Sequence, residues 1–456
     1  MPQPACVPAP AQVEYRARIF HQSPLYRVLY DHYASFQESY PSRFQGEFGL
    51  FRKSVDRAID RFLICGDPRE GVAVFACESC ATKKIVPFSC KTRLFCPTCH
   101  SKRVLLWVEK LQENILSQVP HRFWTFSIPK RLRPYFMYDR GRLGLLTYAA
   151  HRTFALVLGN GAVRKDRRSA VIALIQTHGD ELNWNAHLHL IAADGAFDLR
   201  NPQDIRFLPT LYWDVLKMAE IFRFVLIDRM HKEGILSDDV ATNLMSWAHS
   251  GFHVHASEAF SPSDSDQFAR RLAYAYRTPV SLSQMSYGKD QVYLRTKKGS
   301  ALQLSPLEFI AKLTLHIPDT YLHMRRYAGL YASATRRKLG LKTVVSVKVN
   351  SDRKLSFSWS TLISRIFGQI PTKCPRCGET MKLLGFQTRI EVVRLLIPDV
   401  TRAPPPKPFT PYLILHAGKP FLEAAEGVKP YGHEWSDSQL LPESAADFDQ
   451  RISEEG

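Results

Sequence analysis

Three Cys-x-x-Cys pairs constrain the fold of this chain more than any other feature. They use six of its nine cysteines and stand at Cys77/Cys80, Cys96/Cys99 and Cys374/Cys377. In a reducing compartment, such pairs are typical of metal sites rather than of disulfides. Fifteen residues separate the first pair from the second, which lets two tight turns close one tetrahedral zinc site. The sequence therefore predicts a structural Zn²⁺ held by Cys77, Cys80, Cys96 and Cys99.

The other cysteines have a different interpretation. Cys65 and Cys90 are single thiols, and we expect them to be buried as small apolar side chains. The pair Cys374/Cys377 has no second pair downstream, so a metal there would need a histidine or a distant cysteine. The sequence does not favour a metal at this pair.

The charge balance indicates a polyanionic partner. Lys and Arg total 61 against 43 Asp and Glu, a formal charge of +18, so nucleic acid is the first candidate and an anionic membrane surface the second. The 45% hydrophobic and 23% charged residues are ordinary for a globular protein and exclude a wholly disordered chain. No apolar run approaches the roughly 20 residues of a membrane span, and the N-terminus does not resemble a signal peptide. We therefore expect a cytoplasmic protein without a membrane partner.

The periodicity of apolar residues predicts an α+β fold. Residues 13–62 have helical spacing, and helices are also expected within 140–158 and 206–232. Segments rich in β-branched and aromatic residues predict strands at 121–128, 169–177 and 187–192. These strands are expected to form one mainly antiparallel sheet with flanking helices.

Two histidines lie on the last of these strands. His187 and His189 are two residues apart, so both imidazoles leave the same face of the strand, where they could hold one divalent cation. A hairpin through Gly179 would bring Gln176 or His178 close to the same ion. The alternative is a pair of core histidines with satisfied hydrogen bonds.

A tyrosine is expected on the polar side of a helix that ends at Thr278-Pro279. At 100° per residue, one face is apolar and the opposite stripe carries Gln267, Arg270, Tyr274 and Arg277. Tyr276 falls on the apolar face and is expected to pack. Tyr274 lies beside two guanidinium groups that could hold a phosphate and favour an attacking phenolate, although a structural role is the alternative.

Basic residues predict DNA contacts in two regions. One set surrounds the cysteines and includes Lys83, Lys84 and Arg93. The other, interleaved with Tyr327 and Tyr331, suits a groove where bases stack and phosphates pair, and consists of Arg325, Arg326, Arg336 and Arg337. A solvated helix face is the alternative.

Four blocks together resemble the transposases of the insertion sequence 91 family. In chain order they are FSCKTRLFCPTCHSKR, QTHGDELNWNAHLHLIAADG, RRLAYAYRTPVSLSQM and HIPDTYLHMRRYAGLYA. The family belongs to the HUH superfamily, in which two histidines separated by one hydrophobic residue hold Mg²⁺ or Mn²⁺ and a helix tyrosine nicks single-stranded DNA. The resemblance implies an HUH nuclease domain with a central antiparallel sheet, preceded by a helical segment and a four-cysteine zinc ribbon.

The resemblance also implies roles for individual residues. His187 and His189 match the metal motif, with Gln176, His178 and Gln267 as candidates for a third ligand. Tyr274 matches the nucleophile. Some relatives carry a second tyrosine where this chain has Arg270, so a single-tyrosine mechanism is expected, with Tyr327 and Tyr331 as weaker candidates. Arg277, with Arg270 nearby, would neutralise charge in the transition state.

The implied reaction is rolling-circle transposition. The enzyme would nick and rejoin single-stranded DNA at the element ends through a 5′-phosphotyrosine intermediate, acting on transposon ends and target DNA in a bacterial nucleoid. The alternatives are a zinc-ribbon DNA-binding regulator without nicking activity and a replication initiator or relaxase. The expected domains are a helical segment (1–63), a zinc-binding ribbon domain (64–118), an HUH endonuclease domain (119–345), an accessory region with one Cys-x-x-Cys (346–400) and a disordered tail, Pro-rich and then acidic (401–456).

Overall fold

The computed structural model describes residues 13–15, 19–159, 161, 163–164, 166–201, 204–261, 265–296, 299–341 and 373–397. Residues 346–372 of the expected accessory region, and the whole Pro-rich and acidic tail expected at 401–456, lie outside these residues. Among the described residues, no helix is both long and apolar enough for a bilayer crossing.

The chain divides into two compact units that interleave along the sequence. We name the first the cysteine unit, which comprises Met1–Trp107, Arg277–Ile317 and Lys354–Thr410. The second, the histidine unit, comprises Val108–Tyr276, Pro318–Arg353 and Pro411–Gly456. This division differs from the consecutive domains expected from the sequence, because residues 277–317 cluster with the N-terminal part of the chain.

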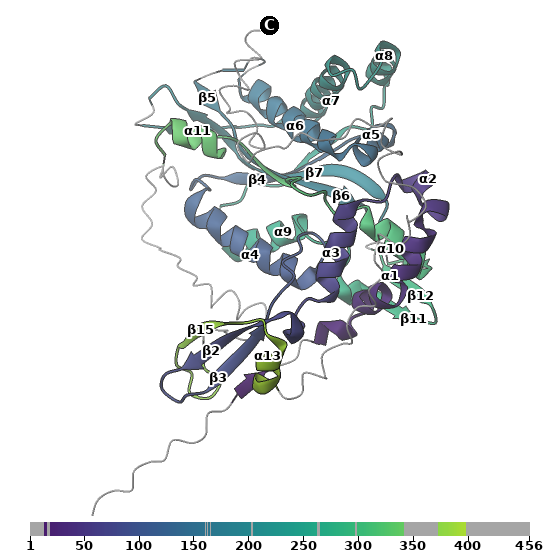
Figure 1. Cartoon of the computed structure of the whole chain (residues 1–456). Helices are drawn as coiled ribbons and strands as arrows, with labels where there is room; N and C mark the ends of the chain where they lie inside the picture. Colours follow the sequence, from purple (N-terminus) through teal and green to yellow (C-terminus); the bar gives the residue numbers. More distant parts are fainter. Residues whose placement is uncertain are drawn as a thin grey trace, which may run out of the picture. The chain divides into compact units, whose positions relative to one another are not determined.

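A five-stranded sheet forms the centre of the histidine unit (Figure 1). Its strand order is β10-β4-β7-β6-β14, and every neighbouring pair is antiparallel. The strands are β4 (His121–Ser127), β6 (Ala170–His178), β7 (Trp184–Ala193), β10 (His253–Ala256) and β14 (Arg325–Gly329). The predicted antiparallel sheet is confirmed, and its three predicted strands correspond to β4, β6 and β7.

One face of this sheet is apolar and is covered by helices α6 (Leu143–Leu158) and α7 (Val215–Lys232) (Figure 1). The ring of Trp124 on β4 lies 5.1 Å from that of Phe154 on α6. The ring of Phe126 lies 5.0 Å from that of Phe222 on α7. Because side chains alternate along a strand, the residues between these two belong to the opposite face.

Helix α9 (Ser265–Ala275) packs on that opposite face. Its Phe268 contacts Phe123 of β4, with ring centroids 6.1 Å apart, and Phe260 stacks on both rings. The unit is completed by α5 (Arg133–Tyr138), α8 (Asp238–Ser246), α11 (Ser333–Lys338) and a small sheet of β5 (Arg167–Arg168), β8 (Gly195–Asp198) and β9 (Arg206–Pro209).

The helical part of the cysteine unit is held together by long-range contacts. Arg52 donates hydrogen bonds to the carbonyl oxygens of Thr314 (2.7 Å) and Ile317 (2.8 Å), which ties the start of α3 to the end of α10. These contacts explain why residues 277–317 belong to this unit. Its elements here are α1 (Pro24–Arg43), α2 (Gln45–Phe48), α3 (Lys53–Leu63), α10 (Pro306–Thr314) and the sheet of β11 (Met285–Gly288), β12 (Gln291–Arg295) and β13 (Ala301–Leu304).

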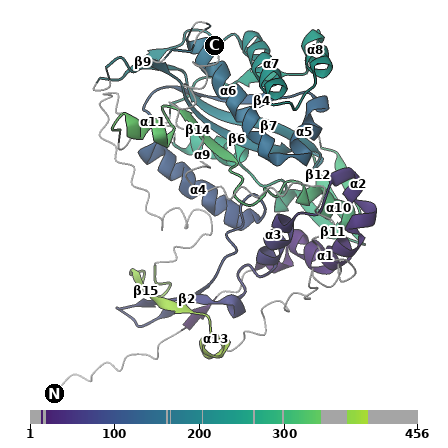
Figure 2. The same cartoon turned by 45° about the horizontal axis from the view of Figure 1, so that its top comes forward.

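A second sheet of the cysteine unit has the strand order β1-β3-β2-β15, so a strand from near residue 380 pairs with one from near residue 75 (Figure 2). Helix α13 (Ile390–Leu396) contributes Val393 to a small aliphatic cluster with Val72, Val74 and Ile85. The strands are β1 (Val13–Tyr15), β2 (Val72–Cys77), β3 (Lys83–Pro87) and β15 (Met381–Gln387). Helix α4 (Pro97–Asn114) follows; its residues up to Trp107 are assigned to the cysteine unit and those from Val108 to the histidine unit.

Candidate functional site

The histidine pair lies on the sheet face that α9 covers. His187 and His189 pair in register with Ser127 and Thr125 of β4, and their ring centroids are 4.9 Å apart. The Nδ1–H of His187 donates to the carbonyl oxygen of Asn185 at 2.7 Å, because a carbonyl can only accept. In this neutral tautomer the lone pair is on Nε2, the form in which an imidazole binds a metal.

Two buried amide oxygens lie on the same face. Gln176 of β6 pairs in register with His187, and Asn185 precedes His187 by two residues on β7. Neither Gln176 Oε1 nor Asn185 Oδ1 has a hydrogen-bond partner among the described residues, although both atoms are buried. A divalent cation would satisfy such oxygens, so the donor set of two imidazoles and amide oxygens fits Mg²⁺ or Mn²⁺.

The other candidates for a third ligand differ from Gln176. A β-bulge between Gln176 and His178 turns the two side chains toward each other, and Gln176 Nε2 lies 2.8 Å from Nε2 of His178. His178 is buried. The side chain of Gln267 lies outside the described part of the chain. Asn185 was missed by the sequence analysis, although its spacing of two from His187 on the strand was a usable signal.

A second pair of histidines was also missed. His253 and His255 on the edge strand β10 pair with Ser127 and Thr125, the residues that face His187 and His189 on the other side of β4. Directly paired residues share a face, so all four histidines belong to one side of the sheet. The repeated His-x-His pattern on a short strand was the signal that could have found them.

Helix α9 presents Tyr274 to solvent, with 52% of its surface exposed, whereas Tyr276 is 4% exposed. Phe268 and Leu272 are buried beneath the helix, and Arg270 is exposed one turn before Tyr274. The orientation predicted from helical periodicity is confirmed. The guanidinium of Arg325 lies over the ring of Tyr276, 5.7 Å from its centroid. Arg325 pairs with Leu174 of β6, which pairs with His189 of β7, so Arg325 and His189 share one face of the sheet. The contact of Arg325 with Tyr276 therefore holds α9 over the histidine face.

The predicted DNA-binding arginines occupy different environments. Arg326 follows Arg325 on β14, points to the opposite face and lies against Gly144 of α6, where burial lowers the pKa of its guanidinium. Arg336 donates to the carbonyl oxygen of Asn114, whereas Arg337 is exposed on α11. The prediction that all four arginines line one surface is therefore wrong for Arg326. Lys83, Lys84 and Arg93 are half-buried in the cysteine unit, and Arg277, also half-buried, belongs to that unit.

Tyr331 is buried and hydrogen-bonded within the histidine unit, which indicates a structural role. It is fully buried, its hydroxyl accepts a hydrogen bond from the backbone N–H of Ser117 (3.2 Å), and it donates to Nε2 of His121 (2.5 Å). Burial raises the pKa of the Tyr331 hydroxyl above its ordinary value, which disfavours a phenolate. Tyr327 is half-buried on β14.

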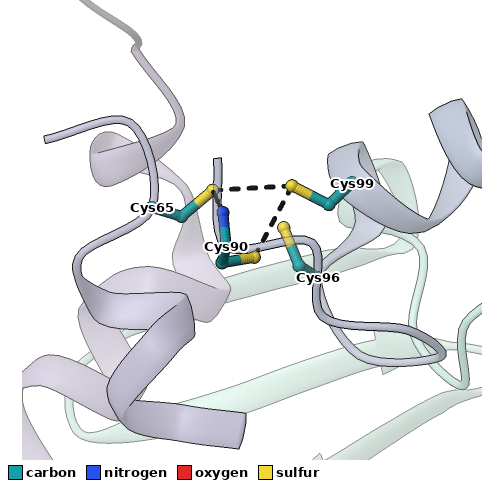
Figure 3. Close-up of side chains that lie close together, drawn as sticks. All are labelled: Cys65, Cys90, Cys96 and Cys99. Atoms are coloured by element: carbon teal, nitrogen blue, oxygen red, sulfur yellow. Dashed lines mark hydrogen bonds between the residues drawn. The ribbon is translucent and has the colours of Figure 1, made fainter. Parts of the chain in front are cut away.

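The structure distributes the cysteines differently from the sequence prediction. Cys96 and Cys99 at the start of α4 meet Cys65 and Cys90, and the four Sγ atoms lie within 4.8 Å of one another (Figure 3). Cys77 and Cys80 are not in this group. They lie at the turn between β2 and β3, whereas Cys65 and Cys90 lie at the open end of the same hairpin. The predicted single site is therefore wrong, because the hairpin separates its two halves, and Cys65 and Cys90 are not spare thiols.

The first group, Cys65/Cys90/Cys96/Cys99, has the geometry of a tetrahedral thiolate site. The Sγ atom of Cys99 lies 3.6 Å from that of Cys65 and 3.5 Å from that of Cys90. A disulfide needs about 2.05 Å, whereas thiolates at about 2.3 Å from one Zn²⁺ are about 3.8 Å apart. Hydrogen bonds from Cys65 and then Cys90 lower the pKa of Cys99 far below its ordinary value, because they stabilise the thiolate. These residues fit a structural zinc.

Comparison with known proteins finds matches for two regions, one with the cysteines of the first group and one with the histidines and Tyr274. Residues 30–128 match the model described as "Transposase zinc-binding domain", and residues 170–338 match the one described as "Putative transposase". By these matches the chain is similar to the transposases of the insertion sequence 91 family. The first match contains all four cysteines of the first group, and the second contains His187, His189 and Tyr274.

Two relatives extend the similarity over most of the chain. The transposase for insertion sequence element IS801 of Pseudomonas savastanoi pv. phaseolicola is 24% identical over 358 residues, which are 74% of this chain and 84% of that protein. The "Putative transposase y4qJ" of Sinorhizobium fredii (strain NBRC 101917 / NGR234) is 22% identical over 354 residues, 71% of this chain and 87% of that protein. No solved structure matches the chain.

Proposed function

We propose that this transposase nicks and rejoins single-stranded DNA at the ends of its element by a rolling-circle route, with Tyr274 as the nucleophile. One observation carries the proposal. The sheet face that holds His187 and His189 beside two unsatisfied buried oxygens is the face covered by α9, the helix that exposes Tyr274. A buried tyrosine such as Tyr331 lacks the access to DNA that this reaction requires.

The reaction is a transesterification. The Tyr274 hydroxyl loses its proton to solvent and its oxygen attacks the scissile phosphorus, while the bond from phosphorus to the 3′ oxygen breaks. The products are a 5′-phosphotyrosine link and a free 3′-OH, which takes up a proton. Rejoining reverses these steps with a 3′-OH as the attacking group. The ester bond is conserved throughout, so ATP is not needed.

Two kinds of side chain would support this chemistry. The exposed guanidinium of Arg270, one helical turn from Tyr274, would pair with the phosphate and offset the developing negative charge, and Arg277 is proposed to assist. His187 and His189, with an oxygen from Gln176 or Asn185, would hold Mg²⁺ or Mn²⁺; His178 and Gln267 are weaker ligand candidates. When bound, a divalent ion supplies Lewis-acid polarisation of the scissile phosphate.

The DNA partner is proposed on charge and exposure. Arg270 and Arg271 are exposed one turn before Tyr274 on α9, although the guanidinium of Arg271 also lies over the ring of Phe123, and Arg337 is exposed on α11 of the same unit. Single-stranded transposon ends and target DNA would contact these guanidinium groups through their phosphates. Lys83, Lys84 and Arg93 offer a second basic set in the cysteine unit. We place this activity in the bacterial cytoplasm, at the nucleoid.

The test uses labelled single-stranded oligonucleotides that tile the ends of the host element. The purified full-length protein is incubated with them in Mn²⁺ or EDTA and analysed on a denaturing gel. We expect a metal-dependent, SDS-resistant protein–DNA adduct that is absent from Tyr274→Phe and retained in Tyr276→Phe, the matched control on the same helix. An adduct that survives in Tyr274→Phe overturns the assignment of the nucleophile. Specific DNA binding without any adduct would favour a regulator.

A further inference from the structure

The pair Cys374/Cys377, which the sequence left without partners, meets Cys77 and Cys80. The Sγ atoms of Cys77 and Cys377 are 3.4 Å apart, and those of Cys80 and Cys374 are 3.5 Å apart. All four Sγ atoms lie within 4.8 Å of one another. As in the first group, these separations are too long for disulfides and close to the edges of a tetrahedron of zinc-bound thiolates.

The two Cys-x-x-Cys turns have the same backbone conformation. In the first, the N–H of Ala81 donates to the carbonyl oxygen of Cys77 (3.0 Å), and the N–H of Cys77 donates to that of Thr82 (2.9 Å). In the second, Gly378 donates to Cys374 (2.9 Å) and Cys374 donates to Glu379 (2.8 Å).

The residue after each second cysteine is also equivalent in the two turns. It adopts the left-handed region in both, with φ of 56° at Ala81 and 78° at Gly378. Such a conformation is unusual for a residue with a Cβ, so its repetition at Ala81 indicates that the turn geometry itself is required. Two matching turns thus aim two thiols each at one point.

Besides its cysteines, the segment 373–397 is held by the pairing of β15 with β2, by the Lys382–Glu78 ion pair (2.7 Å), by a ring contact of Phe386 with Phe88 and by two small apolar clusters. β15 pairs with β2, with Met381 opposite Cys77, and a small apolar cluster joins Cys77, Cys374 and Met381. A second small cluster receives Val393 and Ile397 from this segment, with Ile390 and Leu396 packed against it. Cores of this size contribute little stability on their own, which is the situation in which small domains depend on a metal.

This second group is separate from the first. Cys77 and Cys80 lie at the turn of the β2–β3 hairpin and Cys90 lies beyond its open end, so a strand of five or six residues, about 17 Å long, separates the two groups. One ion cannot bridge that length. The match to the transposase zinc-binding domain covers residues 30–128 and therefore includes neither Cys374 nor Cys377.

We propose that Cys77, Cys80, Cys374 and Cys377 bind a second structural Zn²⁺, which fastens residues 373–397 to the β2–β3 hairpin. Two of these ligands, Cys77 and Cys377, are 300 residues apart in sequence. The chain between them contains the histidine strand β7 and the tyrosine helix α9. The second zinc therefore closes the loop of chain that carries the nucleolytic residues.

The first test counts zinc in the full-length protein purified under reducing conditions, by elemental mass spectrometry. We expect two zinc ions per chain in the wild type and one in Cys374→Ser. Cys96→Ser also loses one, but from the first group. Cys6→Ser, which removes the ninth cysteine of the sequence, keeps two. One zinc in the wild type, or two in Cys374→Ser, overturns the proposal.

The second test measures whether residues 373–397 stay paired with the β2–β3 hairpin. Hydrogen exchange of the β15 peptide, Met381–Gln387, should be slow in the wild type and markedly faster in Cys374→Ser, while exchange in β7 is unchanged. Cys377→Ser should likewise lose the second zinc and slow exchange, whereas Cys377→His, which keeps a zinc ligand at this exposed position of the group, should retain both. Slow β15 exchange in a Cys374→Ser protein that holds one zinc would refute the fastening role. Neither assay depends on nicking, so their outcome is separate from that of the proposed function.

Discussion

Replacing Tyr331 with phenylalanine should destabilise the histidine unit without removing the nucleophile. The Tyr331 hydroxyl accepts from the Ser117 N–H and donates to Nε2 of His121, which in turn donates from Nδ1 to the carbonyl oxygen of Val119 (2.7 Å). Tyr331 and His121 are both fully buried. Tyr331→Phe keeps the ring but leaves one buried donor and one buried acceptor without their partner.

Each orphaned group costs about 1–3 kcal/mol, so the expected loss for the two groups is about 2–6 kcal/mol. For a unit of this size, 1 kcal/mol corresponds to about 2–4 °C, and the apparent melting temperature should fall by roughly 4–24 °C. Differential scanning fluorimetry measures the shift. Tyr212→Phe removes a hydroxyl from a side chain that is 78% exposed, and we expect no shift in that control.

The adduct assay, run below the melting temperature of the variant, completes the argument. Tyr331→Phe should still form the protein–DNA adduct, whereas Tyr274→Phe should keep its melting temperature and lose the adduct. A Tyr331→Phe protein that melts with the wild type but forms no adduct would refute the structural role assigned here and make Tyr331 a participant in the chemistry.

Three further predictions concern pH, backbone packing and salt. Burial lowers the pKa of His121 to about 4, so between pH 6.5 and 4 the unfolded chain protonates this imidazole while the folded chain does not. The contribution of neutral His121 to the free energy of unfolding should therefore be complete above pH 6.5 and fall by about 2 kcal/mol from pH 7 to 5. A melting temperature that does not change over this pH range would contradict this. Gly329 has φ of 61°, and a Cβ there would meet the carbonyl oxygen of Ser169 at 1.9 Å. Gly329→Ala should therefore unfold the edge strand β14, which limited proteolysis would detect. Gly288→Ala, where a Cβ would meet no atom within 4 Å, is the control and should leave stability unchanged. Arg270→Ala should weaken binding of single-stranded DNA and reduce the slope of log affinity against log salt by about one, measured by fluorescence anisotropy; an unchanged slope would show that Arg270 contacts no phosphate.

Periodicity was sufficient for the parts of the site that lie within one element. Alternation placed His187 and His189 on one face of a strand, and helical spacing placed Tyr274 outward and Tyr276 inward. Both patterns reflect a local rule, because burial of one face fixes the orientation of every side chain on it.

The parts that the sequence did not indicate depend on which strands become neighbours. The pairing of Gln176 with His187, and of His253 with Ser127, follows from the strand order and register of the sheet. The cysteine partners depend even more on topology. A spacing of fifteen residues between two pairs is compatible with one site, but the hairpin that those residues form holds the pairs apart, and each pair finds its partners elsewhere.

The candidate metal sites of the two units have different ligand types, and this difference would allow each site to select its own metal ion. The cysteine groups present only thiols, which select Zn²⁺ strongly over Mg²⁺ or Mn²⁺. The histidine face presents imidazoles with amide oxygens, a harder and weaker donor set that suits an ion exchanging with solvent. Under the proposed function, a structural metal would have to stay bound while DNA is cut and rejoined, whereas an ion at the histidine face would have to tolerate the entry and departure of phosphates. Because the ligand types differ, we expect a chelator to stop the proposed nicking, by removing the ion of the histidine face, at concentrations that leave the thiolate sites and the fold intact.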